Sequence, residues 1–198
     1  MSGLILASAS AVRAHLLRQA DITFEAIAPH VDEEALKRDL RGHGAGAEEQ
    51  VRALARAKAL SLCAARPGYF LLGCDQMLIC AGQVYDKPQN RAQARAHLLA
   101  LSAKPHELLT AAALAQNGQI LWEGLTRPSL TMRALDEEFV DRYLDNVGEA
   151  ALASVGGYQL EGYGVHLFEA IEGDWFSILG LPLLQLLKAL RAHGLVPR

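Results

Sequence analysis

The sequence predicts a mixed α/β fold, and three patterns carry the prediction. The apolar run 4–7 breaks into a serine-rich turn and then into helical spacing over 11–20, which is a strand followed by a helix. The strand-like runs 108–115 and 119–122 are joined by an Asn-Gly pair, a strong hairpin signal. An alanine-rich helical segment covers 48–65. Together these patterns predict a central twisted sheet with helices around it.

The other elements follow from local signals. In the first half we predict a strand at 22–27, a polar helix from Asp32 to near Gly42, a stop at Pro67-Gly68, apolar runs at 69–75 and 77–80, and turns at Ala81-Gly82 and Asp86-Lys87-Pro88. In the second half we predict a helix at 90–101, a strand at 130–135, a helix from Asp136 to Leu144, a glycine-dense loop at 156–164, a strand at 165–168 and a final helix at 181–192.

Composition sets the class of protein. With 198 residues and 51% apolar content, the chain can bury one core, or one core split into two lobes around a cleft. The net charge of −3 with interspersed signs offers no basic face for a nucleic-acid polymer. Three cysteines without a C-x-x-C pair indicate a reducing compartment. The sequence shows no basic apolar leader, and its longest apolar stretch, 178–187, is too short for a bilayer, so we predict a soluble cytoplasmic protein that binds no membrane.

The serine turn is a candidate phosphate cradle. Ser10 is placed to cap the first helix, whose free amides and dipole attract an anion. Arg13 in the first turn adds a forked cation for phosphate oxygens. The alternative is that Ser10 only caps the helix and Arg13 is solvated.

Two further residues are candidates for chemistry. Lys58 lies within an apolar helical stripe, so it either reaches the rim of the core or faces a cleft that holds an anionic ligand. Asp75 closes the apolar run 69–75, and a carboxylate at a strand end is well placed to hold a metal or activate water. The alternative for Asp75 is a simple turn residue. Lys87 adds a cation nearby in sequence, and by itself it is an ordinary loop residue.

Motifs over nearly the full length resemble those of the Maf family of nucleoside triphosphate pyrophosphatases. They include the family's serine turn, its D-E step, its A-x-x-K-A helix, its G-x-D strand, its K-P run, its A-G-x-Y…[QE]-G loop and its closing G-L-P. The matching residues are Ser8, Ser10, Arg13, Leu16 and Leu17, then Asp32-Glu33, Ala55, Lys58-Ala59, Gly73-Cys74-Asp75, Lys87-Pro88, Ala94, Leu98, Leu101-Ser102, His106, Thr110, Gly156, Tyr158, Glu161-Gly162 and Gly180-Leu181-Pro182.

The resemblance implies one elongated α/β domain over 1–198 of Maf or ITPase type, with two lobes flanking a cleft, and a homodimer. It implies a hydrolase of acid anhydrides that cleaves a nucleoside triphosphate, standard or modified, between the α and β phosphates. The products are the monophosphate and pyrophosphate, and the role is removal of unwanted nucleotides. The implied cofactor is a divalent cation, Mg²⁺ or Mn²⁺, which binds a few carboxylates and substrate oxygens.

The resemblance to the Maf family also implies roles for individual residues of this chain. Asp75 is the proton acceptor or a metal ligand, and Glu33 is a second metal ligand unless it only favours a helix N-terminus. The groups implied to bind phosphate are Lys58, Lys87, Arg13, Ser8 and Ser10. Tyr158 and Glu161 are expected to close over the base, where a carboxylate accepts hydrogen bonds from guanine. Asp75-Gln76 and Glu161-Gly162 resemble the branch associated with 7-methyl-GTP rather than the one associated with dTTP and UTP.

The chain also departs from the family pattern. Ala11 and Val12 replace a Pro and an Arg, Ala103 and Ala111 replace glycines, and Ser154 replaces a Lys. The lost arginine supports a rival hypothesis, a nucleotide-binding regulator of cell division and septum formation that no longer catalyses. A dinucleotide-binding oxidoreductase fits worse, since no G-x-G-x-x-G follows the first strand. A thiol enzyme built on Cys74 fits worse still, since a cysteine inside an apolar strand is usually inert.

Overall fold

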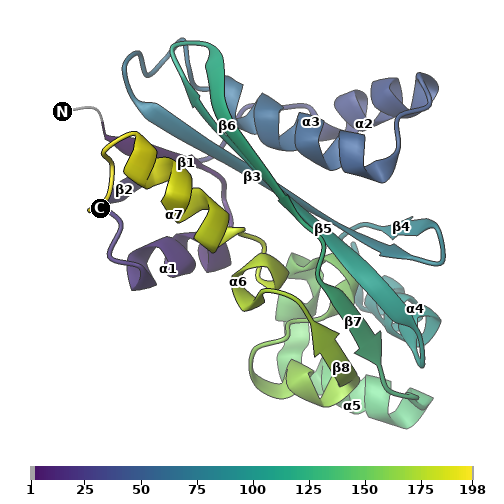
Figure 1. Cartoon of the computed structure of the whole chain (residues 1–198). Helices are drawn as coiled ribbons and strands as arrows, with labels where there is room; N and C mark the ends of the chain where they lie inside the picture. Colours follow the sequence, from purple (N-terminus) through teal and green to yellow (C-terminus); the bar gives the residue numbers. More distant parts are fainter. Residues whose placement is uncertain (1–2, 198) are drawn as a thin grey trace. The chain divides into compact units, whose positions relative to one another are not determined.

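The structure is a computed structural model that describes residues 3–197, and it confirms the mixed α/β fold. Within that range eight strands join in the order β2-β1-β3-β5-β7-β8, with β4 beside β3 and β6 beside β5 (Figure 1). The sheet contains both parallel and antiparallel pairs, and helices surround it. No helix among these residues has the length and apolarity needed to cross a membrane.

The bounds of the elements are as follows. The strands are β1 (Leu4–Ala7), β2 (Phe24–Ile27), β3 (Phe70–Cys80), β4 (Gln83–Tyr85), β5 (Pro105–Gln116), β6 (Gln119–Thr126), β7 (Ser129–Met132) and β8 (Phe168–Glu172). The α-helices are α1 (Ala11–Gln19), α2 (Glu33–Gly42), α3 (Ala47–Leu60), α4 (Arg91–Leu101), α5 (Glu137–Val147), α6 (Trp175–Ile178) and α7 (Leu183–Ala192). Three 3₁₀ helices complete the set, η1 (Gly148–Ala153), η2 (Val155–Gly157) and η3 (Gly162–Leu167).

The chain divides into two compact units. The first comprises Met1–Gln76, Leu109–Thr126 and Asp174–Arg198, and the second comprises Met77–Leu108 and Arg127–Gly173. The single domain over 1–198 and the cleft between two lobes therefore stay predictions.

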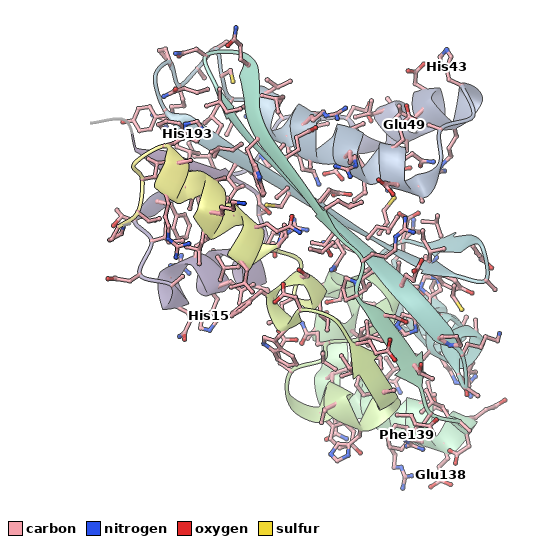
Figure 2. The ribbon with its side chains drawn as sticks, viewed as in Figure 1. His15, His43, Glu49, Glu138, Phe139 and His193 are labelled. Carbon is pink, nitrogen blue, oxygen red and sulfur yellow. The ribbon has the colours of Figure 1, made fainter. Side chains whose placement is uncertain are left out.

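In the first unit, the parallel strands β2, β1 and β3 carry helices on both faces. Leu4, Leu6, Leu72 and Cys74 pack with the leucines of α1 and α7 in one core. His193 after α7, labelled in Figure 2, lies with its ring centroid 5.5 Å from that of Phe70 on β3. Because side chains alternate along a strand, Gly73 faces the opposite side, where α3 lies.

Gly73 permits an unusually close approach of helix and sheet. A Cβ built on it would lie 2.2 Å from the Ala55 carbonyl oxygen and 2.5 Å from the Ala59 amide nitrogen of α3. Only glycine leaves room for that contact. On the same side, Arg56 of α3 forms a forked ion pair with Glu123 of β6, with Nη2 2.7 Å from Oε2. These two contacts fix α3 on the sheet.

The second unit holds the remaining hairpins and helices. Strand β3 turns into β4 through Ala81 and Gly82, both with positive φ, and β5, β7 and β8 pair in antiparallel order. Helix α4 packs against α5 and η2. The apolar side chains predicted for α4, namely Ala94, Leu98 and Leu101, are fully buried there.

The structure corrects several predicted elements. Strand β7 ends at Met132 rather than at 135, and strand β2 begins at Phe24 rather than at 22. Helix α3 ends at Leu60 rather than 65, where the Ser61 hydroxyl donates to the Lys58 carbonyl oxygen at 2.8 Å. Strand β3 runs through Asp75 instead of ending there, because its residues are buried on both faces. Residues 165–167 belong to η3, and the strand β8 begins at Phe168. Helix α6 was not predicted.

Candidate active site

Lys58 joins two carboxylates in the first unit. Its Nζ lies 2.6 Å from Oδ1 of Asp75 and 3.0 Å from Oε1 of Glu33. The side chain of Lys58 is 8% exposed and that of Asp75 is 11% exposed, while Glu33 is 40% exposed. A lysine in an apolar stripe thus finds its partners in two acids, which compensate the loss of its hydration. The cluster carries one positive and two negative charges.

Each member of this cluster is positioned by a local signal. Glu33 is the first residue of α2, which Asp32 caps by accepting from the Ala35 amide at 2.9 Å. Lys58 projects from α3, which packs closely on Gly73, two residues before Asp75. Asp75 lies just beyond the last parallel partner of β1, since Ala7 pairs with Gly73 and β1 ends there. The carboxylate therefore lies at the carboxyl edge of the parallel strands, although β3 continues past it.

The serine turn follows β1 at the same edge. Ser10 caps α1 by accepting from the Arg13 amide at 3.3 Å, as predicted. The buried Ser8 hydroxyl accepts from the Ser10 amide at 3.2 Å. The turn therefore has the strand, cap and helix order of a helix-terminal anion site.

Arg13 directs its side chain into the protein. Its Nε donates to the Gly180 carbonyl oxygen at 2.7 Å, and Nη1 donates to the Cys74 carbonyl oxygen at 2.9 Å and to the Ser8 hydroxyl at 3.3 Å. The predicted alternative of a solvated Arg13 is therefore wrong. Two of these acceptors belong to the site: Ser8 lies in the serine turn, and Cys74 directly precedes Asp75 in the chain.

Sequence reasoning missed a network on the opposite face of β3. The side-chain nitrogen Nε2 of Gln76 donates to the Thr110 hydroxyl at 2.8 Å and to the carbonyl oxygens of Ser177 and Ile178, both at 3.1 Å. Asp174 caps α6 by accepting from the Ser177 amide at 3.0 Å. An Asp at the start of a short apolar segment was the available signal for this helix. Gln76 thus joins α6 to the sheet.

A match to known proteins supplements this geometry. The family model described as "Maf-like protein" matches residues 3–193. The chain belongs to the Maf family. It is 47% identical over 193 residues to a protein of Mesorhizobium japonicum named "7-methyl-GTP pyrophosphatase", covering 98% of this chain and 97% of that one. It is also 47% identical over 190 residues to a "Nucleoside triphosphate pyrophosphatase" of Granulibacter bethesdensis, covering 96% of each. A "7-methyl-GTP pyrophosphatase" of Brucella abortus is 44% identical over 188 residues.

Maf motifs that are distant in sequence meet in the structure. The Lys of A-x-x-K-A contacts the Asp of G-x-D, as described. In the second unit the His and the Tyr of two other Maf motifs also meet, because Nε2 of His106 lies 2.8 Å from the Tyr158 hydroxyl oxygen. Burial lowers the pKa of His106 to about 4 and raises the pKa of Tyr158.

The Maf loop that carries Tyr158 differs from the prediction. Tyr158 is 4% exposed, so its ring is part of the core of the second unit and does not cover a base. Tyr143 holds the next residue by accepting from the Gln159 amide at 3.1 Å. Glu161 is exposed, and so is Lys87 in the segment after β4. Both belong to the second unit, so their place beside Lys58 and Asp75 stays a prediction.

Three departures from the Maf pattern can be placed in the structure. Ala103 stands where the family has a glycine and adopts a φ of 56°, a region that favours glycine. Ala11 is the first residue of α1, the helical position at which proline is well tolerated, so the family's proline fits this site. Val12 leaves the turn with one arginine instead of two.

Cys74 does not form a thiol site. It is completely buried, and burial raises the pKa of its thiol to about 11. The thiolate needed for nucleophilic attack is therefore scarce at neutral pH.

Proposed function

We propose that this protein is a nucleoside triphosphate pyrophosphatase that cleaves between the α and β phosphates and releases the monophosphate and pyrophosphate. The observation that carries the proposal is the buried Lys58 joined to Asp75 and Glu33, on the edge of the sheet where the serine turn ends β1. Cations and acids at one strand edge suit a polyanion held beside a proton acceptor. The relatives' names support the same reaction.

In this mechanism Asp75 is the group that accepts the proton of the attacking water. If Asp75 instead holds a divalent cation, that ion would make the water more acidic. Lys58 exchanges part of its contact with the acids for phosphate oxygens and offsets the charge that grows on the departing pyrophosphate. Ser8, Ser10 and the first amides of α1 receive further phosphate oxygens. Lys87, which matches the Lys of the Maf K-P motif, is a further candidate phosphate-binding residue.

Glu33 and Asp75 fit a divalent cation. Among residues 3–197 no three His, Cys, Asp or Glu side chains gather into a metal site, so a protein-only cage is absent from that range. Each carboxylate has a second oxygen besides the one that contacts Lys58, and two carboxylates suit Mg²⁺ or Mn²⁺, which also take oxygens from the substrate. When bound, the ion neutralises phosphate charge and lowers the pKa of a coordinated water.

The proposed substrate is a purine or modified purine triphosphate of the 7-methyl-GTP kind. The exposed carboxylate of Glu161 is free to accept hydrogen bonds from the guanine ring N–H and the exocyclic amine. Tyr158 supports this loop from within the core. Removal of such nucleotides from the pool is the role we propose, and a homodimer stays a prediction.

The test is a panel of standard and methylated nucleoside triphosphates with Mg²⁺ or Mn²⁺, with and without EDTA, in which products are separated. We expect the monophosphate and pyrophosphate, and loss of both with EDTA. Release of the diphosphate and phosphate would contradict cleavage at the α–β bond. Cleavage of dTTP and UTP alone would contradict the purine preference. Thermal stabilisation by nucleotides without pyrophosphate release would favour the non-catalytic regulator.

A further inference from the structure

The guanidinium of Arg13 is committed to three acceptors from three segments of the first unit. Nε donates to the Gly180 carbonyl between α6 and α7, and Nη1 donates to the Cys74 carbonyl on β3 and to Ser8 after β1. These acceptors are 167, 61 and 5 residues away in the chain. Three of the five N–H donors of an arginine are thereby used by the protein. An ordinary phosphate-binding arginine directs its fork at the ligand.

The bond to Cys74 continues the hydrogen-bond ladder of the sheet. The Phe70 amide donates to the Gly3 carbonyl oxygen at 3.0 Å, and Phe70 is opposite Leu4. In a parallel ladder every second residue faces the same neighbour, so the peptide groups of Cys74 also face the side of β1. However, β1 ends at Ala7, opposite Gly73. The Arg13 guanidinium therefore takes the position of the strand amide that the Cys74 carbonyl lacks.

That carbonyl belongs to the peptide bond that leads into Asp75. Fixing this peptide plane fixes the direction in which the Asp75 side chain leaves β3, toward Nζ of Lys58 at 2.6 Å. Without this donor the buried carbonyl would be left unpaired, which is unfavourable and would let the strand end move. Because pairing with β1 ends at Gly73, the hydrogen bond from Arg13 takes over the task of fixing the backbone that carries Asp75.

The hydrogen bond from Nε of Arg13 to the Gly180 carbonyl oxygen holds the guanidinium from a second side. Gly180 has a φ of 96°, and a Cβ on it would lie 3.3 Å from Nε of Arg13. Both the backbone conformation and the space favour glycine at this position. The G-L-P turn before α7 is therefore built around the arginine.

We infer that Arg13 is a positioning residue that ends the β1–β3 ladder and aims Asp75 at Lys58, and that its role rests on hydrogen-bond donors rather than on charge. The inference rests on the proposed pyrophosphatase activity, because it assigns how the acid of that reaction is held.

Two substitutions of Arg13 distinguish the effect of its hydrogen-bond donors from the effect of its positive charge. Arg13→Lys keeps the charge, but an ammonium cannot reach the Gly180 and Cys74 carbonyls together in the arginine geometry. Replacement of Arg13 by citrulline removes the charge and keeps the shape, the Nε–H and an NH₂ group. The control is Arg18→Lys, at an exposed position of the same helix. The measurements are pyrophosphate release from 7-methyl-GTP with Mg²⁺ and the midpoint of thermal unfolding.

We expect Arg13→Lys to lower kcat at least tenfold while KM changes less than threefold, and to lower the unfolding midpoint. The citrulline protein should lose less kcat and less of the unfolding midpoint than Arg13→Lys, with KM less than tenfold above the wild type. The control Arg18→Lys should keep kcat and KM within threefold of the wild type. A folded Arg13→Lys protein with wild-type kcat would overturn the inference. So would a citrulline protein whose KM rises tenfold, since that result would make Arg13 a phosphate ligand.

Failure of the proposed function gives a different result. In that case the wild type itself releases no pyrophosphate from any triphosphate. The midpoints of thermal unfolding then test the inference alone. A lower midpoint for Arg13→Lys than for the citrulline protein supports the positioning role of Arg13. Equal midpoints for the two proteins contradict it.

Discussion

Nζ of Lys58 lies 2.6 Å from Oδ1 of Asp75, so a helix and a strand 17 residues apart in the chain share one buried ion pair. Glu33 adds a second acid to the same ammonium. Removing one partner of such a pair leaves an uncompensated buried charge.

Lys58→Met is therefore expected to lower both stability and activity. The two acids would lose their cation, and the free energy of unfolding should fall by about 3 kcal/mol. Pyrophosphate release should fall at least a hundredfold, because the phosphates lose their buried cation. Urea denaturation and steady-state kinetics check both effects. The matched control is Lys104→Met, at an exposed site of the second unit, and an equally active Lys58→Met protein would contradict the assignment.

Val12→Arg is expected to restore the second arginine of the serine turn. A charge-assisted hydrogen bond contributes about 1.5–3 kcal/mol, so KM for the triphosphate should fall about tenfold or more. The control Val12→Leu keeps the position apolar and should leave KM unchanged. Titration kinetics at constant ionic strength measure the difference, and an unchanged KM for Val12→Arg would show that this position does not reach phosphate.

Ala103→Gly is expected to stabilise the protein. The φ of 56° places Ala103 in the left-handed region, which costs a residue with a Cβ about 1–2 kcal/mol. After allowance for the greater freedom of glycine in the unfolded chain, the gain should be about 0.5–1 kcal/mol. Ala100→Gly within α4 is the opposite control, with an expected loss of about 1 kcal/mol. Chemical denaturation of the two variants should give changes of opposite sign.

His106 is expected to make stability depend on pH. Burial lowers its pKa to about 4, against about 6.5 in the unfolded chain, so the unfolded state binds more protons between these values. The stabilisation is fully present above pH 6.5 and is lost as the pH falls toward 4, by up to about 3 kcal/mol.

Unfolding of the wild type, of His106→Gln and of His15→Gln from pH 8 to pH 4 tests this dependence. His15 lies on the surface of α1 (Figure 2). The loss should be smaller in His106→Gln than in the other two proteins. Parallel curves for all three would show that His106 is not the group responsible.

Local signals in the sequence predict much of the fold. Ser10, Asp32, Asn90 and Asp136 were identified at the starts of helices, and each accepts from a backbone amide of the first turn. The Asn117-Gly118 turn joins β5 and β6 with positive φ at both residues. Caps and tight turns depend on a few neighbouring residues, which explains why a single sequence reveals them.

The features that local patterns do not reveal depend on distant partners. The apolar run before Asp75 resembles a complete strand, but burial on both faces carries β3 to Cys80. The loop position of Tyr158 predicts exposure, whereas His106, 52 residues away, holds it in the core. The acceptors of Arg13 include a carbonyl 167 residues away, which no spacing rule identifies. Backbone carbonyls leave no mark in a sequence.

The most direct test of the account is pyrophosphate release by Asp75→Asn beside the wild type, with 7-methyl-GTP, Mg²⁺ and circular dichroism as the check on folding. The amide keeps the shape of the side chain but cannot take a proton from water. We predict a folded protein whose turnover falls at least a thousandfold. A folded Asp75→Asn protein with wild-type turnover would contradict the central claim that this carboxylate acts in the reaction.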